Sequence, residues 1–408
     1  MSDVQANSLT RKGFLDSNLV FTALLGFMAC LGQFSSDTYA PAMLQIASAF
    51  GVSINLIQLS MPLYMLGLCS SLLVFGSLSE AFGRRRPLLW GLVIMLVGSI
   101  LCVSSMNAYQ LLAGRVLQGI GAGAGASLWR AMFRDRFEGD ALARYGAYMT
   151  ILLTFVVPAA PMIGGFVSHV LGWRAVFWII IGYALLILCA IYFLLAETSE
   201  HHHMDKLNLG HISRGYLKII RSRAFIGYSL CSFCCYGGYF SWFTVAPVLL
   251  IKHTSLSSAM FGWLCFWGGA LAMFFGGLIG GKLVLRFGAA TMLRLGWSLM
   301  LIAGIQMLFG YWVFGLTIIS PMIAMTLFYF GSTLVFPSLF SGAMQPFAKG
   351  AGFAGSLYAF LQMSGAVVIG AVASFLPADT PISLGLVFVL APLISLVLFE
   401  GVVRPSVA

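Results

Sequence analysis

The chain has 408 residues, of which 60% are hydrophobic and only 8% are charged, with a net charge of +10. Soluble domains carry about 25% charged residues, so this composition excludes an ordinary soluble enzyme or binding module. It indicates a protein that lies in a lipid bilayer. The positive charge could suggest a nucleic-acid partner, but its placement along the chain argues against one.

Apolar segments long enough to span a membrane, at roughly 20 residues each, recur along the whole chain. They cover residues 18–44, 55–80, 87–106, 109–133, 143–169, 174–196, 224–251, 258–285, 289–311, 314–341, 351–377 and 381–403. The sequence therefore predicts an all-α membrane protein with twelve transmembrane helices. The polar stretch 197–223 is expected to link an N-terminal bundle, 18–196, to a C-terminal bundle, 224–403, with short ends at 1–17 and 404–408.

The basic residues are concentrated in the loops on one side of the predicted membrane. If the N-terminus is cytoplasmic, nineteen of the 22 Lys and Arg lie on the inner side, Arg174 and Lys252 lie outside, and Arg115 lies within the membrane. This is the positive-inside pattern with both termini cytoplasmic, so the basic charge reports topology and not binding to nucleic acid. The first apolar segment is too long for a signal peptide and is expected to be retained.

Cysteine and histidine spacing predicts no metal site. Cys231, Cys234 and Cys235 lack the usual second pair of ligands, and the run from His201 to His203 is expected to be a solvated part of the linker. No nucleophile, base and orienting triplet and no phosphate-binding loop appears, so the sequence predicts neither an enzyme nor a cofactor.

The two halves carry related motifs. Phe34-Ser35-x-x-Thr38-x-Ala40-Pro41 recurs as Phe240-Ser241-x-x-Thr244-x-Ala246-Pro247, and Gly76-x-Leu78-x-x-x-Phe82-Gly83 recurs as Gly281-x-Leu283-x-x-x-Phe287-Gly288. Parallel six-helix repeats with a site between them are one known transporter architecture. We therefore expect two pseudo-symmetric six-helix bundles.

Only Asp37 and Arg115 fall deep inside the apolar segments. An ionisable group in hydrocarbon is costly and is a functional-site hypothesis by default. At about 1.5 Å per residue, the two are expected roughly 15 and 9 Å below the outer surface. They could sense one another, although a purely structural pair would give the same sequence pattern.

Three motifs resemble those of the major facilitator superfamily. The loop from Gly76 through Glu80 and Gly83 to Arg84, Arg85 and Arg86 resembles G-x-L-a-D-r-x-G-r-k, with Glu80 in place of the usual Asp. Its glycines permit close helix approach and a tight turn. Its arginines could instead serve only to keep this loop on the cytoplasmic side of the membrane. Arg115-x-x-Gln118-Gly119 resembles the R-x-x-Q-G motif of proton-driven antiporters. This resemblance implies that Asp37, Arg115 and Gln118 couple transport to protons.

In the fifth segment, Pro158, Pro161, Gly164 and Gly165 resemble the exporter motif G-P-x-x-G-G, with Ala160 in the first glycine position. Proline and paired glycines kink a helix and let it pack tightly. The resemblance favours export over uptake and a gating role for this helix, and close packing is part of the same interpretation.

The segments Trp129 to Phe137, Gly172 to Trp178 and Ser36 to Ala42 together resemble the Bcr/CflA branch of the drug:proton antiporters. That resemblance implies a monomeric carrier in the bacterial inner membrane, in contact with lipid, that exports small amphipathic or cationic compounds in exchange for protons. An exporter dedicated to an endogenous metabolite, such as a siderophore or amino acid, would use the same machinery and is the alternative.

Pockets for hydrophobic cations are built from aromatic rings and a carboxylate. Tyr239 and Phe243 are the first candidates, because they lie four residues apart beside the repeated segment that corresponds to Asp37. The full set of expected substrate-binding residues is Asp37, Tyr39, Tyr239, Phe243, Phe266, Tyr329, Phe336 and Met363.

Overall fold

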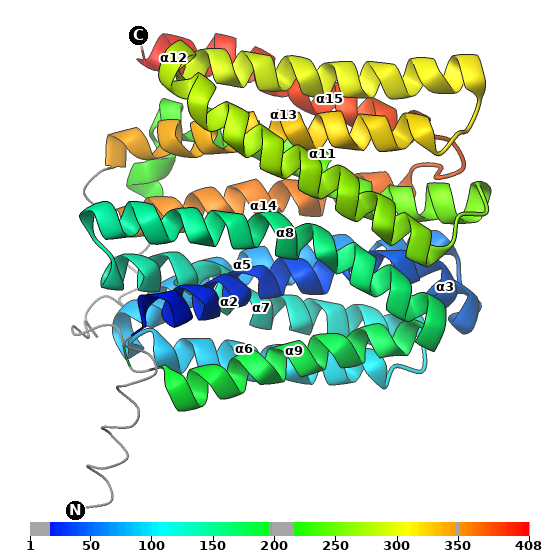
Figure 1. Cartoon of the computed structure of the whole chain (residues 1–408), viewed down its shortest axis with the longest axis horizontal. Helices are drawn as coiled ribbons and strands as arrows, with labels where there is room; N and C mark the ends of the chain where they lie inside the picture. Colours follow the sequence, from blue (N-terminus) through cyan, green and yellow to red (C-terminus); the bar gives the residue numbers. More distant parts are fainter. Residues whose placement is uncertain (1–16, 196, 198–215, 348–350, 408) are drawn as a thin grey trace, which may run out of the picture.

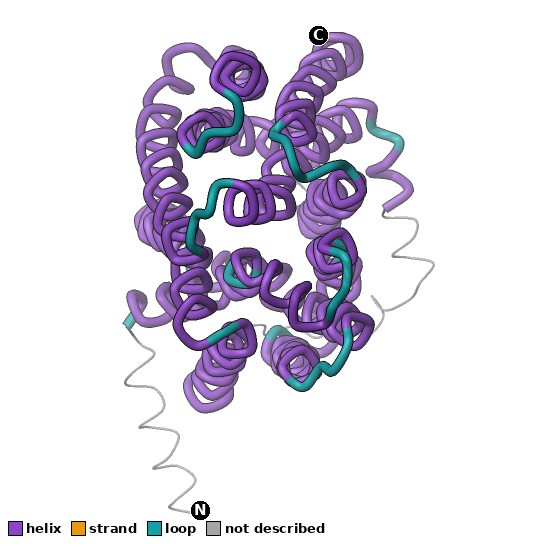
Figure 2. Tube along the Cα trace, turned by 90° about the vertical axis from the view of Figure 1, so that its right-hand side faces the viewer, coloured by secondary structure: helices purple, strands orange, loops and turns teal. Residues whose placement is uncertain are grey.

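A computed structural model describes residues 17–195, 197, 216–347 and 351–407, and within them all regular secondary structure is helical. Two bundles lie side by side, one built from α2 to α9 and the other from α11 to α15 (Figure 1). In the view along the bundles, most helices are seen end-on, and short loops join neighbouring helices (Figure 2).

The first bundle contains six membrane-crossing segments. Its elements are α2 (Asn18–Asp37), η1 (Ala40–Ala42), α3 (Met43–Phe50), α4 (Ile54–Gln58), α5 (Ser60–Phe82), α6 (Arg85–Val103), α7 (Ala108–Arg136), α8 (Gly139–Leu171) and α9 (Trp173–Leu194).

The second bundle has the same number of crossings. Its elements are α11 (Arg223–Pro247), the π-helical turn η3 (Val248–Lys252), α12 (Ser258–Phe314), α13 (Ile319–Met344), η4 (Gln345–Phe347), α14 (Ala351–Phe375), α15 (Ile382–Leu398), η5 (Phe399–Val403) and α16 (Arg404–Val407).

Ten of the described helices are long and apolar enough to cross a membrane. One of them, α12, has 57 residues and leaves the helical conformation at Gly288, so it contains two crossings that fold back on each other (Figure 1). The remaining crossing is α7, whose arginines and glycines lower its hydropathy but whose 29 residues pack between α5 and α6. The predicted twelve-helix architecture is therefore confirmed.

The repeated motifs adopt related conformations in the two halves. Gly83 has φ 82° and ψ 176°, and Gly288 has φ 75° and ψ 164°. Side chains almost never tolerate this region, so glycine is required at both turns. Pro41 lies in the 3₁₀ turn after α2, and Pro247 ends α11 just before η3. A proline cannot donate the regular helical hydrogen bond, which accounts for the change of winding at both places.

The first crossing is longer than its apolar pattern predicts. We expected it to end near residue 44, but helix continues to Phe50, where Gly51 adopts a left-handed conformation with φ 62°. Gln45 is accommodated because its amide donates a hydrogen bond of 2.9 Å to the carbonyl oxygen of Ser168. A polar side chain therefore did not mark the end of this helix.

The start of α2 and the short helix α16 lie at the same end of the molecule, at the left of Figure 1. We call the opposite end, which contains α3, α4 and η3, the distal end. The two bundles contact each other mainly through α8 against α12 and α5 against α14. These two helix pairs enclose the site described next.

Candidate functional site

Asp37 is the last residue of α2, and its side chain is 0% exposed. The amide nitrogen of Gln33, one turn earlier, lies 3.0 Å from one carboxylate oxygen and 3.1 Å from the other. The amide oxygen of Gln33 in turn accepts a 3.1 Å hydrogen bond from the Tyr236 hydroxyl on α11. The carboxylate of the first bundle is thus connected to the second bundle through one glutamine.

Arg115 on α7 is also 0% exposed and is held by groups from several helices. Its guanidinium donates to the carbonyl oxygen of Ser35 at 3.2 Å and to the side-chain oxygen of Gln118 at 2.6 Å. It lies between two aromatic rings, 4.5 Å from the centre of Tyr39 and 4.2 Å from that of Tyr64. Cation–π contacts of this kind are strongest where water is excluded.

Gln118 connects Arg115 to another helix. Its amide nitrogen donates to the hydroxyl of Ser99 on α6 at 2.8 Å, while its oxygen accepts from Arg115. The R-x-x-Q-G motif therefore forms a chain of hydrogen bonds from α2 through α7 to α6. This arrangement fixes the direction of the guanidinium.

Among the described residues, Asp37 and Arg115 are the two charged side chains that are buried, and no ion pair joins them. Arg115 instead reaches the backbone of Ser35, two residues before Asp37. Two charges in a poorly polarisable interior still interact beyond contact distance. The cation can therefore influence the carboxylate without occupying its hydrogen-bonding positions.

An aromatic cluster lies on the side of the second bundle that holds Tyr236. Tyr239 stacks on Tyr329 with ring centres 4.2 Å apart and on Tyr236 at 6.0 Å. Phe243 and Phe336 contact Tyr239 edge-on at 6.3 and 6.5 Å. The structure thus brings together four of the expected substrate-binding residues, Tyr239, Phe243, Tyr329 and Phe336, and joins them to Asp37 through Tyr236.

The other expected substrate-binding residues lie elsewhere. Tyr39 is fully buried against Arg115 and Phe177 in the first bundle. Phe266 contacts Trp263 and Trp267, both of which are exposed on the outside of α12. Met363 on α14 is partly buried against the main apolar core. Among the described residues, neither the Tyr39 ring nor the Phe266 ring contacts a ring of the aromatic cluster.

The glycine and arginine loop between α5 and α6 forms a polar network. Arg84 donates to Asp135 at 3.2 Å and to the Ser79 hydroxyl at 2.8 Å. Arg85 donates to the carbonyl oxygen of Tyr192 at 2.6 Å. Glu197 accepts from the backbone nitrogens of both arginines, at 2.7 and 3.2 Å, and so caps the start of α6. A carboxylate is favourable at a helix N-terminus.

Gly76 and Glu80 lie on the last turns of α5, where this helix meets α14. A Cβ atom on Gly76 would lie 3.2 Å from the Ser356 hydroxyl of the second bundle. Glu80 is half-buried beside it. The loop motif therefore contains both a turn and a close approach between the two halves.

The adjacent glycines of α8 face different partners. A Cβ atom on Gly164 would collide with the backbone of Thr38, within the first bundle, whereas one on Gly165 would collide with the backbone of Ser258 at the start of α12. Across the same contact, a Cβ atom on Gly262 of α12 would collide with the backbone of Pro161, and one on Gly269 would lie 3.5 Å from the Pro158 side chain. The predicted exporter motif thus lies directly at the interface between the bundles.

Two side chains of α4 close the distal end of the site. Gln58 donates to the carbonyl oxygen of Thr244 at 2.9 Å, and Asn55 donates to that of Ser374 at 2.8 Å. Both bonds run from the first bundle to the second. Around them, α11 and η3 are continuously buried from Gly237 to Leu250. We call these two bonds the distal seal.

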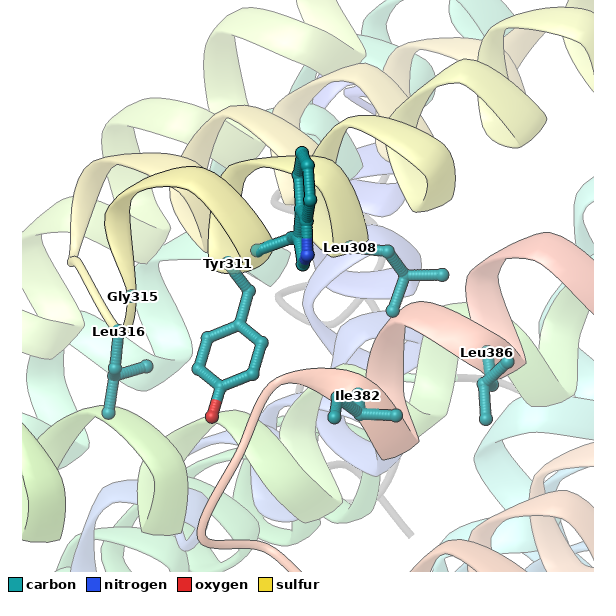
Figure 3. Close-up of a pocket in the computed structure, with 7 residues that line it drawn as sticks. Leu308, Tyr311, Gly315, Leu316, Ile382 and Leu386 are labelled. Carbon is teal, nitrogen blue, oxygen red and sulfur yellow. The ribbon is translucent and has the colours of Figure 1, made fainter.

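An apolar cavity of about 730 Å³ lies near the distal end between α12 and α15 (Figure 3). Tyr311 and Leu308 of α12 face Ile382 and Leu386 of α15 across it. All of its lining residues belong to the second bundle, and none is an expected site residue. It is separate from the Asp37 and aromatic groups.

Sequence reasoning missed Gln33 and Tyr64 as site residues, and it placed Tyr236 only among the aromatic residues of the seventh span expected near the central cavity. Gln33 had a detectable signal, because it lies four residues before Asp37 and hence on the same helix face. Tyr64 had no signal beyond its residue type. The roles of Tyr64 and Tyr236 depend on how α5 and α11 pack around α2, which a single sequence does not reveal.

Two similar six-helix bundles with a buried carboxylate and an aromatic cluster between them define a secondary transporter. The sequence of residues 23–370 matches the family model of the Major Facilitator Superfamily. The chain therefore belongs to this superfamily, as its motifs predict.

Individual relatives agree with this assignment. The chain is 28% identical to multidrug resistance protein D of Escherichia coli (strain K12), over 92% of this chain and 94% of that protein. It is 25% identical to a bicyclomycin resistance protein homolog of Haemophilus influenzae, over 89% of this chain and 91% of that protein. The latter agrees with the predicted Bcr/CflA resemblance.

Solved structures show the same fold. The structure of a D-xylose-proton symporter superposes on this one with a TM-score of 0.75 and 15% sequence identity. The superposition covers 93% of this chain and 97% of the symporter chain. The peptide transporter POT in complex with sulfate gives a TM-score of 0.74, also at 15% identity, with 94% of each chain covered. At this identity, the similarity supports the fold and not a substrate.

Proposed function

We propose that this protein is a proton-coupled exporter of small amphipathic or cationic organic compounds across the bacterial inner membrane, with both termini cytoplasmic. Its two halves, residues 18–196 and 224–403, move relative to each other and are joined by the linker 197–223. The transporter works as a monomer. The names of its relatives, which include a multidrug and a chloramphenicol resistance protein, support drugs as the cargo.

Asp37 carries the proton in this proposal. The observation that supports it most strongly is a fully buried carboxylate beside the boundary between the halves, hydrogen-bonded toward the aromatic cluster. Burial favours the neutral acid, and the nearby Arg115 favours the carboxylate. A movement of either half changes this balance, so proton binding and substrate binding can alternate.

Tyr239, Phe243, Tyr329 and Phe336 supply the substrate surface. Their stacked rings suit a flat or cationic organic compound, and Asp37 supplies the negative charge that a cation needs. The charge of Arg115 stabilises the ionised form of Asp37, and Gln118 keeps the guanidinium of Arg115 in place. Gly165 and the loop at Gly83 allow the halves to move past each other.

Replacing Asp37 by Asn tests this proposal. We expect Asp37→Asn to abolish substrate-induced proton release and uphill export of tetraphenylphosphonium, while keeping some binding of neutral chloramphenicol. Proton release is measured on purified protein, and export in proteoliposomes with an imposed pH gradient. Undiminished proton release in Asp37→Asn would place the coupling site elsewhere.

A further inference from the structure

Gln33 occupies an unusual position, because its one amide group contacts both the proton-carrying candidate and the opposite half. The –NH₂ group lies against both oxygens of Asp37, and the carbonyl oxygen accepts from Tyr236. Only the –NH₂ group can donate to an ionised carboxylate, which has acceptors alone. The observed amide orientation is therefore the one that matches a charged Asp37.

A protonated Asp37 demands a different arrangement. The neutral acid carries a hydroxyl that donates a hydrogen bond, and the Gln33 amide would present an acceptor, its oxygen, to that hydroxyl only after turning over. The terminal torsion of glutamine has a broad, roughly two-fold preference, so the amide can turn over. Its oxygen then faces Asp37 and its –NH₂ faces Tyr236, whose hydroxyl must accept and direct its own hydrogen elsewhere.

We propose that Gln33 is a positioning residue that transmits the protonation state of Asp37 to Tyr236 by reversing its amide. The proton itself stays on Asp37, and only the direction of the two hydrogen bonds changes. The inference rests on the proposed role of Asp37 and adds the physical connection to the second bundle.

The connection leads into the substrate surface. Tyr236 stacks on Tyr239 with an angle of 17° between the rings, and Tyr239 stacks on Tyr329 at 21°. A change in the Tyr236 hydroxyl therefore acts on the first ring of a continuous stack. Substrate between these rings would act on Gln33 in the reverse direction, since coupling between two sites is reciprocal.

Other groups near Asp37 do not provide this route. Those that carry or can carry charge are Arg115 and Tyr64 from the first bundle, and Tyr236, Tyr239, Tyr329 and Cys265 from the second. The Tyr64 hydroxyl donates to the carbonyl oxygen of Gly32 at 2.7 Å, within its own bundle. Tyr329 donates to the backbone of Tyr239, also within its own bundle. Tyr236 is the group among them that bonds Gln33.

Two variants remove the connection at its two ends. Gln33→Met keeps the length of the side chain but removes both hydrogen bonds, and Tyr236→Phe removes a single oxygen atom. We expect each to reduce uphill tetraphenylphosphonium export at least about tenfold, the effect of losing one hydrogen bond to a charged network. Downhill counterflow should fall less than uphill export in both variants, because these substitutions remove hydrogen bonds but leave the stacked rings and the movement of the halves in place.

Three further measurements separate coupling from a structural role. The double variant should be no worse than Gln33→Met alone, because residues in one network are not additive. The infrared band of Asp37, identified by its loss in Asp37→Asn, should shift in Gln33→Met and, because the coupling is reciprocal, by a smaller amount in Tyr236→Phe. Tyr183→Phe is the matched control, since its hydroxyl donates to the carbonyl oxygen of Phe27 within the first bundle.

Normal uphill export in either single variant, or additive losses in the double variant, would overturn the Gln33 connection. Failure of the proposed function has a different result, in which Asp37→Asn keeps proton release. If wild-type protein releases protons through Asp37 while Gln33→Met exports normally, the proposed function stands and only the connection is wrong.

Discussion

At the scale of single residues, Asp37 and Arg115 are separated by their partners. The guanidinium bonds Ser35 and Gln118 and lies between two rings, while the carboxylate bonds Gln33. A direct ion pair in such an interior would be hard to break during a transport cycle, because removing one partner leaves an unpaired buried charge. Indirect interaction is compatible with the change of protonation that we propose for Asp37.

Arg115 provides a test at this scale. Lys has a compact charge and no flat group, so it cannot keep the Nη1 bonds to Ser35 and Gln118 and also lie face to face between Tyr39 and Tyr64. We expect Arg115→Lys to keep less than about one tenth of uphill export, the cost of roughly one lost charged hydrogen bond, and Arg115→Ala to lose both export and proton release. Flux at matched membrane abundance measures this, with the exposed Arg221→Lys as control. Wild-type flux in Arg115→Lys would show that charge alone suffices.

At the scale of helices, adjacent residues of α8 serve different contacts. Gly164 packs on Thr38 inside the first bundle, and Gly165 packs on Ser258 of the second. Close approach of backbone to backbone has no room for a side chain, and neither backbone can move aside as a flexible side chain could. The same motif therefore combines folding of one half with contact between the halves.

We expect Gly164→Val to lower the free energy of unfolding by about 1–3 kcal/mol or more, the usual cost of overpacking. Gly165→Val should instead preserve most of the melting temperature and impair exchange, because it lies between surfaces that part during transport in the proposed mechanism. Melting and flux are measured on the same samples. Gly182→Val is the control, because a Cβ atom there meets nothing within 4 Å. Equal loss of melting temperature in Gly164→Val and Gly165→Val would contradict this division.

At the scale of the whole molecule, the structure is closed at the distal end. Gln58 and Asn55 of α4 bond backbone oxygens of α11 and α14, and the Gly165 contact joins α8 to α12. All three link one bundle to the other. With cytoplasmic termini, as proposed, the distal end faces outward, so this conformation is closed toward the outside.

Loss of the distal seal should favour opening at that end. Gln58→Leu removes one hydrogen bond, worth about 0.5–1.5 kcal/mol, and should raise the distally open population about two- to tenfold. Labelling of Thr244→Cys in a background without the native cysteines measures it. Gln45→Leu is the control, because its bond to Ser168 lies within the first bundle. An unchanged labelling rate in Gln58→Leu would show that the seal does not set this equilibrium.

The sequence by itself determined the class of fold, the repeat and the two buried charges. Hydrophobic length counts the spans because lipid leaves backbone groups no other partner than a helix, and Asp37 and Arg115 are conspicuous because charge in hydrocarbon is costly. Gly83 and Gly288 were visible as a repeated motif, and both adopt the turn that only glycine tolerates.

Only the tertiary structure decided which residues meet. It placed Tyr39 on Arg115 and Phe266 beside exposed tryptophans, away from the cluster of Tyr239 and Tyr329. It also joined Gln33 to Tyr236, more than 200 residues away. The physical reason is that an apolar helix in a membrane has no strong amphipathic pattern to indicate which face meets a neighbour and which meets lipid. Those faces are chosen by close packing between helices, which spacing along one chain does not record.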